Sequence, residues 1–87
     1  MSGEFLYQSL EEMAATYFYS FTCNHAFNDG NKRVGLLVCE IFLEFNGFEL
    51  RLTDDEAEDL SLGVADGRVT KEELTELIRR AMVPQTP

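Results

Sequence analysis

A chain of 87 residues is long enough for one small domain, and its 45% hydrophobic and 26% charged residues are typical of a soluble globular protein. Its formal net charge of −9 disfavours binding to nucleic acid or to an anionic membrane, because like charges repel. The longest apolar run, residues 34–45, contains two glutamates and is too short to span a bilayer, and no secretory signal opens the chain. We therefore expect a cytoplasmic protein without a membrane segment.

The first predicted element is a helix over about residues 9–24. Its apolar residues recur at a spacing of three to four, which places them on one face of a helix. They are Leu10, Met13, Ala14, Tyr17, Phe18 and Phe21.

A second helix is predicted to run from Asn28 or Asp29, either of which can cap its first turn, to about Asn46. Gly47 follows, and glycine suits the left-handed position just beyond a helix end. The helix is apolar on nearly every side, which predicts that it occupies the centre of the molecule.

Two further helices are predicted after a short segment, residues 48–52, that is too short to classify and could be extended. Each begins with the pattern Thr-x-x-Glu, at Thr53 and at Thr70, which favours reciprocal capping of a helix N-terminus. They are expected to end near Gly67 and near residues 83–84. The predicted fold is a single all-α domain, a compact helical bundle around its second helix.

The segment between the first two helices carries the strongest functional signal. Free backbone N–H groups at a helix N-terminus attract an anion, and two cations in the same turn strengthen this attraction, which predicts a phosphate-binding cradle. Asp29 could hold Mg²⁺, and the imidazole of His25 could take a proton from an attacking hydroxyl. The candidate residues are His25, Asp29, Gly30, Asn31, Lys32 and Arg33.

Four of these residues also have a purely structural interpretation. Asp29 could only cap the second helix, Gly30 could be a simple turn glycine, and Lys32 and Arg33 could be ordinary solvated cations. However, Lys32 and Arg33 are the only basic residues among the first 50, so the positive charge of this acidic half lies entirely at the predicted cradle. A cation at a helix N-terminus is mildly unfavourable unless an anion binds there.

The motif resembles the signature of the Fic/Doc family, His-x-Phe-x-Asp/Glu-Gly-Asn-x-Arg followed by a second Arg. Leu36 stands in place of that second Arg, and the Asn-Lys-Arg run is similar to that of the Doc (death-on-curing) toxin branch. The resemblance implies a single Fic/Doc-type domain over residues 1–87. With 24 residues before His25, we expect it to lack the N-terminal helices and the flap of the family.

The resemblance implies transfer of a nucleotide-derived group to a protein hydroxyl, with ATP and Mg²⁺ as cofactors. His25 would be the base, Asp29 the metal ligand, and residues 30–33 the phosphate-binding groups. A Doc-like kinase acting on a Ser or Thr of elongation factor Tu is favoured by Leu36, which has no donors for the extra phosphate contacts of an AMP transferase.

Two alternatives stay open. One is a Fic-like AMP transferase, favoured by Gly30 where Doc has Ala, and the other is a catalytically silent binding module. The expected partners are a Phd-like antitoxin and the protein substrate, and a homo-oligomer is a further alternative.

Overall fold

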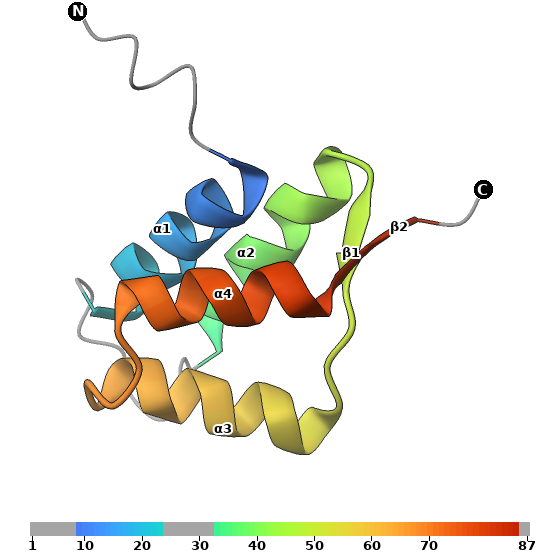
Figure 1. Cartoon of the computed structure of the whole chain (residues 1–87). Helices are drawn as coiled ribbons and strands as arrows, with labels where there is room; N and C mark the ends of the chain where they lie inside the picture. Colours follow the sequence, from blue (N-terminus) through green and yellow to red (C-terminus); the bar gives the residue numbers. More distant parts are fainter. Residues whose placement is uncertain (1–8, 24–32, 86–87) are drawn as a thin grey trace, which may run out of the picture.

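The computed structural model describes residues 9–23 and 33–85 of the chain. In this part, helices dominate and the two strands have three residues each, so the predicted all-α class is confirmed (Figure 1). The elements in chain order are α1 (Leu10–Cys23), α2 (Val34–Phe45), β1 (Phe48–Leu50), α3 (Asp54–Ala65), α4 (Lys71–Ala81) and β2 (Met82–Pro84).

The third and fourth helices begin as their sequences predict. The hydroxyl of Thr53 accepts a hydrogen bond from the backbone N–H of Glu56 at 3.1 Å, and the Glu56 carboxylate accepts one from the backbone N–H of Thr53 at 2.9 Å. Thr70 and Glu73 repeat this arrangement at the start of α4. Each capping box satisfies two N–H groups that the helix itself leaves free.

The ends of α2 differ in how well the sequence predicts them. Gly47 follows the C-cap residue Asn46 with a φ of +87°, as expected for glycine beyond a helix end. At the other end α2 begins at Val34, later than predicted, with Arg33 at the N-cap position in a non-helical conformation. The predicted caps, Asn28 and Asp29, lie outside the described residues.

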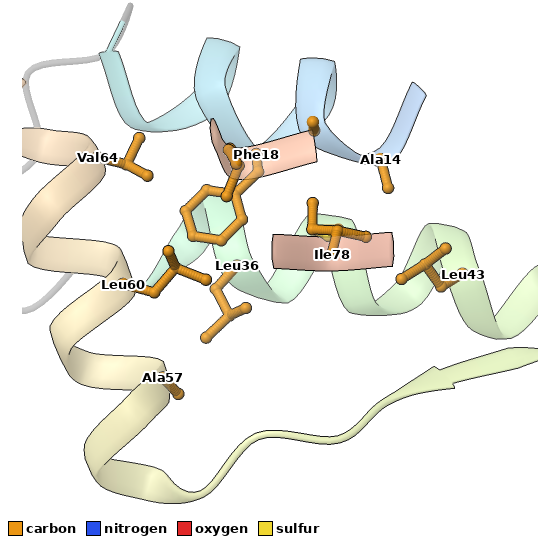
Figure 2. Packing of buried hydrophobic residues seen from close by; sticks show 11 residues of the cluster. Ala14, Phe18, Leu36, Leu43, Ala57, Leu60, Val64 and Ile78 are labelled. Atoms are coloured by element: carbon orange, nitrogen blue, oxygen red, sulfur yellow. The ribbon is translucent and has the colours of Figure 1, made fainter. Parts of the chain in front are cut away.

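The hydrophobic core is shared by all four helices. Figure 2 shows Phe18 of α1 extending toward α2, and Leu36 of α2 extending toward α3, with Leu60 of α3 close to both. The antiparallel pairing of β1 with β2, in which Leu50 lies opposite Met82, ties the end of α4 to the segment that follows α2. The buried apolar residues are Ala14, Ala15, Phe18, Leu36, Cys39, Leu43, Ala57, Leu60, Val64, Leu74 and Ile78.

The helices α1 and α2 approach each other closely at Gly35. A Cβ atom at this position would overlap the side-chain oxygen of Thr22 and lie 2.6 Å from the backbone carbonyl oxygen of Phe18. Because the second obstacle is backbone, it cannot be relieved by a change of rotamer. The start of α2 is therefore held against the last turns of α1 by a contact that only glycine permits.

The face of α2 opposite the core is exposed, although its sequence is apolar on nearly every side. Leu37, Ile41 and Phe45 have exposed fractions of 55%, 45% and 86% among the described residues. The helix contacts α1, α3 and β1, and these neighbours cover its other side. Despite this apolar character, neither α2 nor any other helix in the described part is long and apolar enough to cross a membrane.

We expect Gly35→Ala to destabilise the domain by about 1–3 kcal/mol, because the added methyl group has no room between α1 and α2. Urea denaturation followed by circular dichroism measures this change. Thr22→Val is the matched control at the same contact. It keeps the shape of the Thr22 side chain and removes a buried hydroxyl that has no hydrogen-bond partner among the described residues, so we expect this variant to be at least as stable as the wild type. Equal stability of Gly35→Ala and the wild type would contradict the close contact.

Candidate functional site

The predicted site residues divide into two groups. His25, Asp29, Gly30, Asn31 and Lys32 lie within residues 24–32, outside the part that the structure describes. Arg33 is described, at the N-terminus of α2. The structure thus places one of the six predicted residues, together with the two helix ends between which the motif runs in the sequence.

Those two helix ends are held together by packing. Thr22 lies in the last turn of α1 and Gly35 in the first turn of α2, and these turns meet at the contact that excludes a Cβ. Cys23, the last residue of α1, donates its thiol to the backbone oxygen of Val64 in α3 at a sulfur–oxygen distance of 3.7 Å. The core therefore holds in place the residues that flank segment 24–32 on either side.

Arg33 is suited to meet an anion at the N-terminus of α2, which we call the mouth of this helix. It is exposed, and its guanidinium makes no ion pair with any described residue. Its backbone oxygen accepts the first hydrogen bond of the helix, from the N–H of Leu37 at 2.9 Å. Among the described residues no side chain caps this end, and the first turn carries no acidic residue. An anion there would interact with free backbone N–H groups, the positive end of the helix dipole and one guanidinium.

Leu36 is a core residue rather than part of the anion site. Its exposed fraction is 2%, and it packs in the cluster with Phe18 and Leu60 (Figure 2). A guanidinium in its place would be buried among apolar side chains, which is costly without a paired anion. The structure therefore gives a packing reason why this position supplies no second cation to the mouth of α2.

A shallow hollow of about 270 Å³ opens beside Arg33 and extends along α2 toward Glu40. Burial raises the pKa of the Glu40 carboxyl above its ordinary range, the nearby Glu44 raises it further, and Arg33 lowers it. Glu40 would repel an anion placed in this hollow. An anion bound by Arg33 would therefore sit at the N-terminus of α2 rather than along the side of the helix.

Sequence reasoning missed two residues that shape this region. Gly35 sets the helix contact, and a glycine inside an apolar helical run was a usable signal for close backbone approach. Glu40 sets the electrostatics of the hollow, and its signal was a charge within the longest apolar run.

Comparisons with known proteins agree with the resemblance of the motif. Residues 1–43 match the model of the Fic/DOC family. The chain is 35% identical over 71 residues to a protein named "Protein kinase doc" from Escherichia phage P1, and the match covers 82% of this chain and 56% of that protein. The chain thus spans about half the length of the curated relative that it matches.

Glu40→Gln should stabilise the domain at neutral pH. Because the pKa of Glu40 is raised in the folded state, the folded protein binds its proton more tightly than the unfolded chain does, and stability falls as the pH rises through this window. The variant lacks this loss, so we expect it to be more stable than the wild type at about pH 7 and equally stable at about pH 4. Urea midpoints at the two pH values measure the difference, and Glu58→Gln on the exposed side of α3 is the control. A variant less stable than the wild type at neutral pH would refute this explanation.

Proposed function

The chain belongs to the Fic/Doc family, and on this basis we propose that it is a Doc-like toxin of a toxin–antitoxin pair that transfers a phosphoryl group from ATP to a Ser or Thr hydroxyl of a protein. The observation that carries the choice of phosphoryl transfer is the burial of Leu36. The position where the family signature has a second Arg belongs to the core here, so the mouth of α2 presents Arg33 without a second guanidinium one turn further along. The similarity to a protein named as a kinase supports the same choice.

In the proposed reaction, the substrate hydroxyl oxygen attacks the γ-phosphorus of ATP and its proton passes to the imidazole of His25. The bond between the γ-phosphorus and the bridging oxygen breaks, and ADP leaves. Asp29 would hold Mg²⁺, whose charge offsets that of the phosphates. Positioning and electrostatic stabilisation supply most of the catalysis in reactions of this class. The phosphate-binding groups would be Gly30, Asn31, Lys32 and Arg33.

A Fic-like AMP transferase is the second candidate, because Gly30 follows the general signature of the family where Doc has Ala. The same cradle could serve either reaction, since it recognises a phosphoryl group and its developing charge rather than one particular phosphate of ATP. A catalytically silent binding module is the remaining alternative.

We further propose that the protein acts in the cytoplasm, that its substrate is elongation factor Tu and that a Phd-like antitoxin controls it. The basis is the similarity to the Doc protein of phage P1 over 82% of this chain. The matched region covers 56% of the phage protein. The proposed substrate and antitoxin are therefore those of a whole protein of this kind.

The proposal is tested by incubating the protein with elongation factor Tu, ATP and Mg²⁺ and determining the mass of the intact factor. We expect an increase equal to one phosphoryl group. General-base loss lowers rates by about 100-fold to 10,000-fold, so His25→Ala should reduce the transfer by this factor. Arg33→Ala should also reduce it, whereas Arg51→Ala, an exposed cation that follows β1, should not. Circular dichroism must show that each variant is folded.

The other outcomes distinguish the alternatives. An increase equal to one AMP group would show the Fic-like transferase instead. No adduct from the folded protein would leave the binding module as the better interpretation, and equal activity of Arg33→Ala and Arg51→Ala would remove the mouth of α2 from the site.

A further inference from the structure

The outward face of α2 carries an unpartnered apolar stripe. Leu37, Ile41 and Phe45 follow one another at intervals of four residues, which places them along one side of the helix. All three are exposed, and 86% of Phe45 is accessible to solvent. We call these three residues the α2 stripe. Scattered exposed apolar residues are ordinary on protein surfaces, but a continuous row of them marks a surface that binds another molecule.

Two shallow hollows follow one another along this face. The first, of about 270 Å³, is lined by Val34, Leu36 and Leu37 together with Arg33 and Glu40. The second, of about 250 Å³, is lined by Ile41, Glu44 and Phe45. Each hollow thus combines apolar walls with one glutamate. The two glutamates are one helical turn apart, a separation of about 6 Å along the helix axis.

The charge of this face indicates the character of its occupant. Glu40 and Glu44 raise the negative potential along the stripe, and Arg33, at the end of the first hollow, is the one basic residue among the described residues that line either hollow. Burial and, to a lesser extent, the neighbouring Glu44 raise the pKa of Glu40, whereas Arg33 lowers it, so the two glutamates repel each other along the stripe. A cation brought to this face would relieve that repulsion.

A second copy of the chain fits this face poorly. A two-fold contact through α2 would bring the same face of each copy together, so the glutamates of one stripe would approach those of the other. The two chains would also each bring a net charge of −9. Charge complementarity therefore favours a basic partner over self-association.

We propose that the α2 stripe binds an amphipathic α-helix of another polypeptide, whose apolar side chains cover Leu37, Ile41 and Phe45 and whose two basic residues, four positions apart, meet Glu40 and Glu44. Lys and Arg match the hollows because their aliphatic stems pack on apolar walls while their charged ends reach a carboxylate. A spacing of four residues on the partner helix reproduces the one-turn separation of the two glutamates. The proposal is independent of the phosphoryl transfer, since it uses no residue before Arg33.

Two synthetic peptides test the proposal by fluorescence anisotropy with the whole chain. One is an amphipathic helix with a leucine stripe flanked by two lysines four positions apart, and the other has glutamates in place of these lysines. We expect the lysine peptide to bind at least about tenfold more tightly. The double variant Glu40→Lys/Glu44→Lys should reverse this preference. Asp54→Lys/Glu58→Lys, an equal change of charge on exposed positions of α3, should retain it.

The apolar part of the surface is tested separately. Phe45→Ser should weaken binding of the lysine peptide by about tenfold or more, whereas Leu77→Ser, at an exposed leucine of α4, should not. Sedimentation should show a monomer. The proposal is overturned by a lysine peptide that does not bind, by equal binding of the two peptides, by a charge reversal without effect, or by a dimer that Phe45→Ser dissociates, which would make a second copy the occupant.

Discussion

The contact between α1 and α2 at Gly35 is the constraint on which the rest of the structure depends. It lets the backbone of α2 approach the carbonyl oxygen of Phe18, and this close approach sets where the first turn of α2 lies relative to the last turns of α1. Phe18 of α1 and Leu36 of α2 then pack in one cluster with Leu60 of α3 (Figure 2). Because residues 24–32 connect these same two turns, the helix contact also fixes both ends of the segment that carries most of the functional motif.

Three parts of helix α2 differ in their surroundings: the inward face, the N-terminus and the outward face. Its inward face builds the core through Leu36, Cys39 and Leu43, of which Cys39 is buried deeply enough for its thiol pKa to rise to about 12. Its N-terminus carries Arg33, which we propose meets an anion together with the first backbone N–H groups of the helix. Its outward face exposes the α2 stripe. Leu36 connects the first two of these parts, because a residue committed to the core cannot also serve as a phosphate ligand.

Local signals made much of this fold predictable from the sequence. The capping boxes at Thr53 and Thr70 and the left-handed Gly47 each depend on a few neighbouring residues, and all three are confirmed. The start of α2 and the exposure of its outer face depend on which helices pack against it, and an apolar sequence does not reveal this. For the same reason, the sequence shows that the side chain of Leu36 has no hydrogen-bond donor, but it does not show that this side chain is buried. The roles of His25, Asp29 and residues 30–32 stay predictions, since these residues lie outside the described part.

The proposed reaction requires the N-terminus of α2 to bind the phosphates of a metal–nucleotide complex. The most direct test of this requirement is the broadening of amide NMR signals by ATP with Mn²⁺ in place of Mg²⁺, compared with ATP and Mg²⁺. We expect strong broadening at Arg33 and Val34 and at the end of α1 near Thr22. We expect weak broadening at Phe45, because the opposite end of this 12-residue helix is about 18 Å away. Broadening centred on the acidic first turn of α3, with the signals of Arg33 and Val34 unchanged, would contradict the proposal.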